Sequence, residues 1–287
     1  MNAEHRTVRR KHRGITMRWT GALAAQFFIP QSPMPACGKP VVRRSQHIRL
    51  REEERMRYIA LLGEYTSTFT PHVATEIAIR HSSAVLSTAI NGEWVSTQDI
   101  DESLFSRYSG IWVAPGSPYK NLERTLWALE HARTNKVPCF GTCGGFQHMV
   151  LEYARNVLRY RDAQHAEYDP YASTLFISRL ACSLAGREME LRFESGSLVA
   201  EIYGSMSARE EYYCNFGVDP GKVGFLASSG LRISGSDSEG EVRVIELPNH
   251  PFYLGTLFVP QTRSTERQPH PLVTAFVQAV AAAAGQH

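Results

Sequence analysis

The sequence predicts an α/β protein whose sheet is doubly wound and mostly parallel. Short apolar runs alternate with segments of helical periodicity from residue 58 to residue 157, and strands that alternate with helices of about 10–15 residues pair in parallel through right-handed crossovers. Polar or glycine-rich loops follow three of these runs, at Glu64, Gly116 and Cys143. Because the carboxyl ends of parallel strands share one edge of the sheet, we expect these three residues to converge there.

Each element is predicted from a local pattern. Apolar runs indicate strands, an apolar period of about 3.6 residues indicates helices, and Pro71 suits a first helical position. In the first half we expect strands at residues 58–63, 84–90, 111–115 and 137–140, and helical segments at residues 71–83, 100–108, 122–135 and 146–157. In the second half we expect strands at residues 174–178, 188–193, 198–203, 211–218 and 255–260, a hairpin of residues 231–234 and 241–247, and a closing helix over residues 271–284.

The turn around Cys143 is the most informative stretch. An apolar strand precedes Gly141-Thr-Cys-Gly-Gly145, and helical spacing resumes directly after it. Glycines supply the backbone angles that such a reversal needs. A strand, a tight turn with a nucleophilic residue and a helix make a nucleophile elbow, here built on Cys instead of Ser. We expect the helix N-terminus to lower the pKa of the thiol, and the N–H groups of Gly116 and Gly144 to hold an oxyanion.

Composition and charge argue against several kinds of partner. The chain has 287 residues and a net charge of +3, but residues 1–55 carry 12 Lys and Arg against 4 Asp and Glu, so the remainder, with 19 against 24, is mildly acidic. A nucleic-acid partner would need basic residues gathered on the folded body, and the sequence predicts no such partner. No apolar run approaches the roughly 20 residues of a membrane-spanning helix, so no membrane partner is expected.

Cysteine usage and motif content limit the chemistry further. Five cysteines at irregular spacing do not indicate a disulfide framework. No CxxC pair, no His, Asp or Glu spacing and no phosphate loop indicates a metal or a cofactor, and we expect neither. A reducing compartment, and hence a cytoplasmic location, is the expectation.

The first 55 residues are expected to lie outside the folded domain, which then spans residues 56–287. They begin with the basic cluster at residues 9–13 and contain a modest apolar run over residues 19–29. We interpret them as a disordered extension or as sequence upstream of a translation start at Met56. A targeting peptide is the alternative, but the stretch before Cys37 lacks a clean small-x-small cleavage site.

Motifs spread over the whole domain resemble one family. They are Cys143-Gly-Gly-Phe-Gln147, Glu152-Tyr-Ala-Arg-Asn-Val157, Ala166-Glu167-Tyr-Asp169, Glu246-Leu-Pro-Asn-His-Pro-Phe252 and Pro269-His-Pro-Leu272. From about Tyr58 to Ala283 the chain resembles the class I glutamine amidotransferase domain of CTP synthase. The resemblance implies the doubly wound α/β fold and a thiol at Cys143 that takes the γ-glutamyl group from glutamine. It also implies that Gln147 and Glu167 line the glutamine pocket.

The same resemblance marks departures from the family pattern. Val259 and Gln261 stand where the family carries the His base and the Glu that orients it. Asn215 stands where the family carries an arginine that holds the α-carboxylate of the substrate, and losing such a pair typically costs roughly a few kcal/mol. Pro115-Gly116-Ser-Pro118 replaces a Gly-Gly pair. The ATP-dependent synthetase half has no counterpart here, as in stand-alone proteins similar to the C-terminal region of CTP synthase, so the chain alone is not expected to make CTP.

Without that His, a nucleophilic Cys143 needs another base. The candidates are Glu64 and His72, which flank the loop after the first strand, together with His148 and His165. Glu64 could instead be a solvated loop acid, His72 a neutral imidazole in a first helical turn, and His148 a packed histidine.

The thiols have two interpretations as well. Cys143 could be a small buried hydrophobe, although the cost of its Gly-Thr-Cys-Gly-Gly backbone favours a reactive thiol. Cys214 could be a core cysteine or a second thiol that resolves an oxidised Cys143.

Two functions fit these observations. In the first, the protein is an enzyme, a cysteine-dependent amide hydrolase or acyltransferase in which Glu64 or His72 replaces the base. Its substrate is a small amide, glutamine or an analogue, in a pocket that includes Asn215. In the second, the protein is a pseudo-amidotransferase that keeps the pocket and serves a synthetase partner as a binding or regulatory module. The simultaneous loss of base, orienting acid and arginine supports the second.

Overall fold

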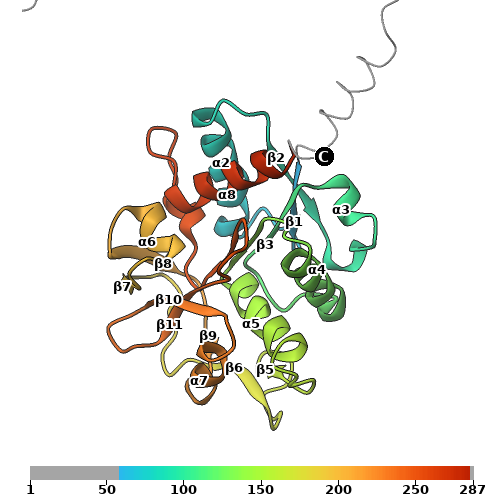
Figure 1. Cartoon of the computed structure of the whole chain (residues 1–287), viewed down its shortest axis with the longest axis vertical. Helices are drawn as coiled ribbons and strands as arrows, with labels where there is room; N and C mark the ends of the chain where they lie inside the picture. The colour runs from blue at the N-terminus through green and yellow to red at the C-terminus, as the bar shows by residue number, and fades with distance from the viewer. Residues whose placement is uncertain (1–57, 285–287) are drawn as a thin grey trace, which may run out of the picture. The chain divides into compact units, whose positions relative to one another are not determined.

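A nine-stranded mixed sheet forms the centre of the computed structural model, which describes residues 58–284 (Figure 1). The order of its strands is β2-β1-β3-β4-β12-β11-β10-β7-β8. These strands are β1 (Tyr58–Leu62), β2 (Asn91–Val95), β3 (Gly110–Val113), β4 (Cys139–Thr142), β7 (Arg187–Phe193), β8 (Ser207–Tyr212), β10 (Arg232–Ser236), β11 (Val242–Glu246) and β12 (Tyr253–Thr256). A small second sheet contains β5 (Gln164–His165), β6 (Leu175–Arg179) and β9 (Phe216–Val218). The predicted extension over residues 1–55 lies outside the described residues.

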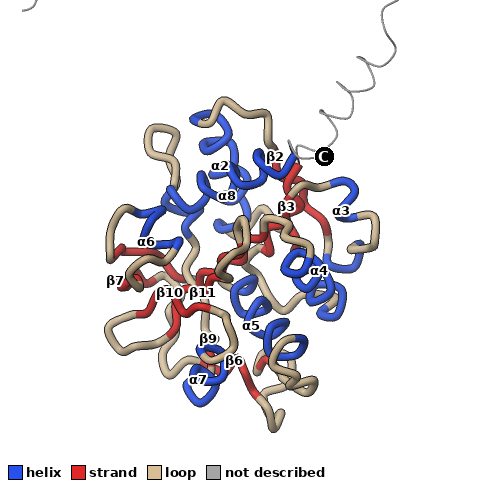
Figure 2. The backbone as a smooth tube through the Cα atoms, in the orientation of Figure 1, coloured by secondary structure: helices blue, strands red, loops and turns tan. Residues whose placement is uncertain are grey.

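Helices cover both faces of the large sheet (Figure 2). They are α2 (Thr70–Val85), α3 (Leu104–Arg107), α4 (Leu122–Thr134), α5 (Gly144–Asn156), α6 (Leu198–Tyr203), α7 (Val223–Ala227) and α8 (Pro271–Ala284), with short 3₁₀ turns η1 (Thr97–Asp99), η2 (Pro220–Lys222) and η3 (Pro260–Arg263). Helices α2 and α8 pack together on one face, and α4 and α5 pack together on the other. None of the helices within residues 58–284 has both the length and the apolar character that a bilayer crossing requires.

The large sheet has a parallel half and an antiparallel half. Strands β2, β1, β3, β4 and β12 pair in parallel, whereas β12, β11, β10, β7 and β8 pair antiparallel. The α/β prediction is confirmed. The alternation of strands and helices predicts the parallel half. The β-like segments later in the sequence form the antiparallel half.

Strands β1 and β3, inside the parallel half, consist of apolar residues and glycine because helices cover them on both sides. Residues 59–62 of β1 and 111–113 of β3 are fully buried. Trp112 packs against Phe140 of the neighbouring strand, with ring centroids 4.8 Å apart, and against Phe276 of α8 at 5.8 Å. These contacts fix the central strands whose carboxyl ends form one edge of the sheet.

Two predicted strands are wrong. Residues 84 and 85 complete α2, so β2 begins only at Asn91, as an edge strand beside β1. Residues 198–203 form α6 instead of a strand. The signals for that helix are local, because the Ser197 side chain accepts a hydrogen bond from the Ala200 N–H and Gly204 ends the helix with φ 61°.

Other elements differ in their limits. The predicted strand at residues 211–218 is two strands, β8 and β9, in different sheets, with a break at residues 213–215. The elbow strand runs from Cys139 to Thr142 and its helix begins at Gly144, so the reversal is confined to Cys143. The last strand spans Tyr253–Thr256 instead of residues 255–260. The break between β8 and β9 matters most because it brings a loop to the candidate site.

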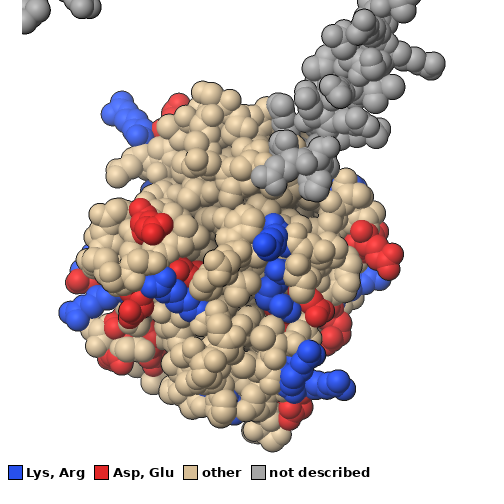
Figure 3. Space-filling view, viewed as in Figure 1, with Lys and Arg blue, Asp and Glu red and all other residues tan. Residues whose placement is uncertain are grey.

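Charged side chains do not gather by sign on the face in Figure 3, where lysines and arginines alternate with aspartates and glutamates. The expectation that nucleic acid is not a partner stays a prediction.

Helix α5 and the central strands approach each other very closely. A Cβ atom added at Gly145 would lie 2.0 Å from the Val113 carbonyl oxygen of β3, and one added at Gly141 would lie 2.4 Å from the Met149 Sδ. Backbone cannot yield as a flexible side chain can. Glycine is therefore required at position 145 for α5 to start directly above β3.

We expect Gly145→Ala to destabilise the fold by about 2 kcal/mol or more, because the added methyl group meets the Val113 carbonyl. The matched control is Gly224→Ala in α7, where nothing lies within 4 Å of the added Cβ, so the change should be neutral or stabilise by up to about 1 kcal/mol. Urea unfolding followed by circular dichroism measures both. Equal stability of Gly145→Ala and the wild type would contradict the packing described above.

Candidate functional site

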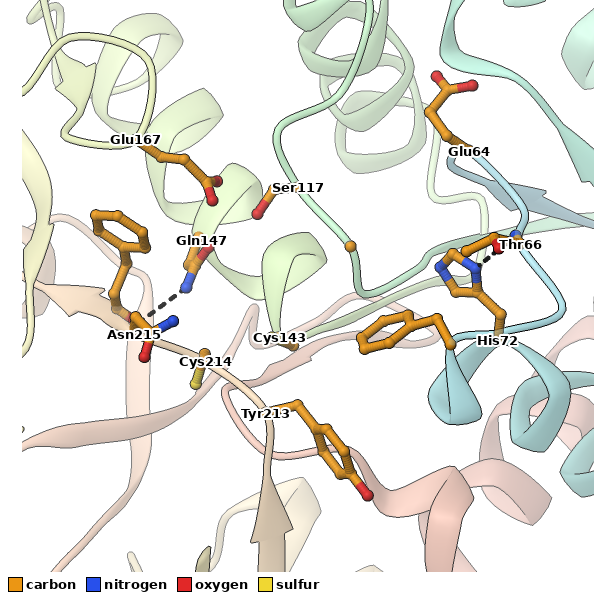
Figure 4. A pocket seen from close by; sticks show the side chains of 13 residues that line it. Glu64, Thr66, His72, Ser117, Cys143, Gln147, Glu167, Tyr213, Cys214 and Asn215 are labelled. Atoms are coloured by element: carbon orange, nitrogen blue, oxygen red, sulfur yellow. Dashed lines mark hydrogen bonds between the residues drawn. The ribbon is translucent and has the colours of Figure 1, made fainter. Parts of the chain in front are cut away.

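A pocket of about 320 Å³ lies at the carboxyl ends of the parallel strands (Figure 4). Glu64, Gly116 and Cys143 all line it, which confirms the expected convergence of the three strand ends. The other lining residues are Thr66, Phe69 and His72 from the segment after β1, Ser117 after β3, Gln147 of α5, Glu167 after β5, and Tyr213, Cys214, Asn215 and Phe216 from the break between β8 and β9 and the start of β9.

Cys143 occupies a strained turn at the base of this pocket. Its φ of 52° and ψ of −105° lie outside the regions that non-glycine residues prefer, at a typical cost of about 1–3 kcal/mol. Its N–H donates to the Thr256 carbonyl at 2.8 Å, and its carbonyl accepts from the Gln147 N–H at 3.2 Å. The residue is therefore held from both sides, by β12 and by α5, as an elbow requires.

The pKa of the Cys143 thiol is raised, so the predicted lowering is wrong. The largest cause is a hydrogen bond with the Cys214 thiol, followed by burial, and the charge of Glu167 adds to both. A hydrogen bond from the Gly144 N–H favours the thiolate but does not outweigh them. One main-chain donor at the helix N-terminus cannot compensate for removing the sulfur from water.

His72 is a neutral imidazole with both nitrogens engaged. The Thr66 N–H donates to Nδ1 at 3.1 Å, so Nε2 carries the proton and donates it to the Pro115 carbonyl at 2.8 Å. Burial lowers the pKa of His72, against the effect of these two hydrogen bonds. The ring ties the loop after β1 to the loop after β3 and presents no free lone pair to Cys143.

Glu64 is also occupied, and its side chain points away from Cys143 in Figure 4. Its carboxylate accepts hydrogen bonds from the Ser96 hydroxyl at 2.9 Å and from the N–H and hydroxyl of Thr97 at 3.1 and 2.5 Å, with the Lys120 ammonium 3.5 Å away. Burial raises the pKa of Glu64, but these hydrogen bonds outweigh it and lower the pKa overall. Glu64 thus anchors the η1 turn.

His148 is fixed inside the protein. Its Nδ1 donates to the Gly144 carbonyl at 2.7 Å, and its Nε2 accepts from the Tyr168 hydroxyl at 2.9 Å. The direction follows because a carbonyl can only accept, so Nδ1 carries the proton of the neutral ring; the Tyr168 hydroxyl also accepts the Tyr119 N–H at 2.8 Å. Burial lowers the pKa of His148 to about 4. His148 is the packed histidine that the sequence offered as the alternative.

His165 and Gln147 form one hydrogen-bonded chain. The Glu167 N–H donates to Nδ1 of His165 at 3.0 Å, so Nε2 donates to the Gln147 Oε1, also at 3.0 Å. Burial lowers the pKa of His165 well below its usual range. Gln147 in turn donates from Nε2 to the Phe216 carbonyl at 2.8 Å. Gln147 therefore holds the start of β9 beside the elbow helix.

Glu167 is the lining carboxylate with acceptor capacity to spare. The Ser117 hydroxyl hydrogen-bonds to it, but burial dominates and raises its pKa. Its Oε2 atom is buried without a hydrogen-bond partner among the described residues. Figure 4 shows the carboxylate directed into the pocket. A ligand N–H or ammonium would satisfy this oxygen.

Val259, Gln261 and Asn215 are the positions at which the resemblance implies departures from the family pattern. Val259 is fully buried, and it follows β12, the strand beside the elbow strand. Gln261 donates from Nε2 to the hydroxyls of Thr75 and Thr142 at 3.2 and 3.4 Å, while its Oε1 is buried without a partner among residues 58–284. Asn215 lines the pocket with an exposed side chain. Nothing at these three positions supplies a base or a cation.

The sequence analysis missed several lining residues. Ser117, Thr66 and Phe69 follow strand ends, so the same rule that selected Glu64 and Gly116 would have included them. Tyr213 carried no comparable signal, because the segment was expected to continue as a strand. No group of three or more His, Cys, Asp or Glu side chains within residues 58–284 is arranged to hold a metal ion.

Comparisons with known proteins find a matching family model and similar sequences. A family model described as glutamine amidotransferase class-I matches residues 74–279. A CTP synthase from Cyanothece sp. is 30% identical over 235 residues, which are 77% of this chain and 43% of that protein. A CTP synthase from Sulfurisphaera tokodaii is 33% identical over 237 residues, which are 78% and 45%. The chain thus spans less than half the length of these relatives.

Solved structures agree on the fold. The glutaminase domain of CTP synthase from Trypanosoma brucei, with bound acivicin, has a TM-score of 0.72 at 24% identity and covers 78% of this chain and 94% of that one. A glutamine amidotransferase from Thermotoga maritima has a TM-score of 0.51 at 8% identity, covering 80% and 99%. At such identities the likeness concerns the fold alone.

Glu167 should make stability fall as pH rises. Its folded pKa is raised, so the folded state holds a proton that the unfolded chain releases near pH 4.5, and stability is lost as pH rises toward the folded pKa. Glu167→Gln removes this effect. The variant should gain stability relative to the wild type as pH rises above about 4.5, where the wild type begins to lose it.

Urea unfolding at a series of pH values measures the difference, with Glu102→Gln on an exposed loop as the control for losing one charge. A Glu167→Gln variant that loses stability relative to the wild type over this range would show that the carboxylate has a partner in the free protein.

Proposed function

Because the chain belongs to the class I glutamine amidotransferase family, we propose that its pocket binds a small amide of the glutamine type beside Cys143 and acts by binding more than by hydrolysis. The domain is related to the glutaminase half of CTP synthases. One observation supports binding over turnover: His72, His148 and His165 each use both ring nitrogens in hydrogen bonds inside the protein. The raised pKa of the Cys143 thiol agrees with it.

The expected loss of the His base would determine the rate of hydrolysis. Amide hydrolysis at a cysteine requires the thiol proton to leave before or during attack, and losing a triad base typically lowers turnover by about 10³-fold or more unless another group substitutes. Neither Glu64 nor His72 offers a free acceptor directed at the sulfur. We therefore assign neither of them the role of base, which the sequence had left open.

The binding features remain in place. The Gly144 N–H already donates toward the Cys143 sulfur and would donate equally to a carbonyl oxygen beside it. Gly116 lines the same pocket on the opposite loop. The free Oε2 of Glu167 suits an ammonium or amide N–H of the ligand. A primary amide that also carries an amine satisfies these groups together.

Ligand binding without turnover would serve to regulate a partner protein. The relatives that match this chain are CTP synthases more than twice as long as the matching part, and on this basis we propose that a synthetase is the partner and responds to occupancy of the pocket. Binding that rigidifies the two loops around the pocket would change the surface that such a partner contacts.

A second function rests on the strained elbow. The positive φ of Cys143 and the Gly144 donor are features of an attacking thiol. In this alternative the protein is a slow amide hydrolase or acyltransferase, and Glu167, whose charge acts on the thiol, accepts its proton.

The test measures binding and turnover on the same full-length protein. Glutamine at 100 times its dissociation constant should stabilise the protein by about 2.7 kcal/mol, seen as a higher melting temperature. Ammonia release should be at the background level, equal to that of Cys143→Ala. Ammonia release that depends on Cys143, with labelling of Cys143 by a glutamine-like chloroketone, would establish the second function instead. Absence of both stabilisation and ammonia release would reject both functions.

Ligand charge should separate the recognition groups. Among the described residues no Lys or Arg lines the pocket, whereas Glu167 has a free oxygen. Removing the amine of glutamine, as in glutaramate, should therefore weaken binding more than removing its carboxylate, as in 4-aminobutanamide. The expected difference is about 10-fold or more, as for a charge-assisted hydrogen bond. Glu167→Gln should abolish the difference, measured by calorimetry, and a preference for glutaramate would contradict this assignment.

A further inference from the structure

We propose that Cys143 and Cys214 form a reversible disulfide in the wall of the pocket, so that this thiol pair is an oxidation site of the protein. Both side chains line the pocket, and both are nearly buried, with 6% and 4% of their surface exposed. Figure 4 shows them as neighbours between the elbow and the break that follows β8. Both are free thiols.

The two thiols lie side by side in the pocket. The Cys143 thiol donates toward the Cys214 sulfur, because this hydrogen bond raises the pKa of Cys143, and the Cys214 thiol in turn donates to the Leu257 carbonyl at 3.5 Å. A disulfide requires the sulfurs to move from contact to a bond of about 2.05 Å. A hydrogen-bonded pair starts close to that arrangement.

Each cysteine is fixed by interactions that do not involve the other. The N–H of Cys143 donates to Thr256 at 2.8 Å. The carbonyl of Cys214 accepts from the Leu184 N–H at 3.0 Å, and the Gln147 amide holds the adjacent Phe216 carbonyl. The fold therefore imposes the proximity of the thiols.

A hydroperoxide supplies the oxidising equivalents. One thiol, as its thiolate, attacks the terminal peroxide oxygen, which gives a sulfenic acid and releases water or an alcohol. The second thiol then attacks that sulfur, the S–S bond forms, and the hydroxyl group leaves with the second thiol's proton as water. Two electrons pass from the thiol pair to the peroxide. A dithiol reverses the step by thiol–disulfide exchange.

The bond would disable the site. It removes the Cys143 sulfur as a nucleophile and draws residues 213–215 toward the elbow, where a ligand would lie. Oxidation would then switch off binding or turnover, whichever the reduced pocket performs. The proposal itself does not depend on what the ligand is.

The remaining cysteines of the described region provide controls. Cys139 is fully buried within β4, and Cys182 is exposed on a loop. Neither lines the pocket. An oxidation governed by exposure alone would select Cys182, whereas one governed by proximity selects Cys143 and Cys214.

The experiment oxidises the full-length protein with a small excess of hydrogen peroxide, blocks free thiols with iodoacetamide, and maps the digest by mass spectrometry without reduction. We expect a cross-linked pair of peptides containing Cys143 and Cys214, about 2 Da lighter than the sum of the reduced peptides. Dithiothreitol should restore both thiols. In Cys214→Ser, Cys143 should instead accumulate as a sulfenic acid that dimedone labels, whereas Cys182→Ser should behave like the wild type.

Cross-links that involve Cys182, or oxidation of Cys143 that is equally reversible with and without Cys214, would overturn the proposal. Loss of the glutamine-induced rise in melting temperature after oxidation is a separate readout. If glutamine never stabilises the reduced protein, the proposed function fails while the mapped disulfide still stands or falls by itself.

Discussion

The contact between Gly145 and the Val113 carbonyl is the constraint on which the site depends. It lets α5 begin directly above the neighbouring strand, so the chain must reverse within one residue, and Cys143 takes a positive φ as a result. The reversal also places the Gly144 N–H beside the sulfur. Any side chain at position 145 would push the helix away and remove both the donor and the strain. The packing of α5 on the sheet therefore also determines where the Cys143 thiol lies.

The polar groups around that thiol are mostly satisfied by the protein itself. His72, His148 and His165 link loops and helices, each through both nitrogens, and Glu64 holds a turn. In a site built for rapid proton transfer at least one such group would face the nucleophile with a free lone pair. Two side-chain oxygens near the thiol have no partner among residues 58–284, the Glu167 Oε2 and the Gln261 Oε1, and of these two residues only Glu167 lines the pocket. These hydrogen bonds are the basis of the proposal that the pocket binds a ligand more than it hydrolyses one.

Periodicity and strand-end rules located much of this molecule in advance. The first strand, the helices near residues 71, 122 and 271 and the convergence of three strand ends followed from patterns that lie within one segment. Two of the errors share a cause. The break at residues 213–215 arises because β8 and β9 join different sheets, and no local pattern encodes that. The predicted direction of the Cys143 pKa shift was wrong for the same reason. Cys214, whose hydrogen bond raises that pKa, is 71 residues away in the sequence and comes close to Cys143 only after folding.

The His72 imidazole links two walls of the pocket, the loop after β1 and the loop after β3. Its protonation state therefore affects how firmly these loops are held together. Only the neutral ring can accept from the Thr66 N–H while donating to the Pro115 carbonyl. Burial lowers the folded pKa of this ring below its unfolded value, so stability falls as pH drops from about 6.5 toward the folded pKa. Protonation breaks the first bond and frees one wall from the other. Acidification should therefore weaken the link between the loops after β1 and β3 that flank the pocket.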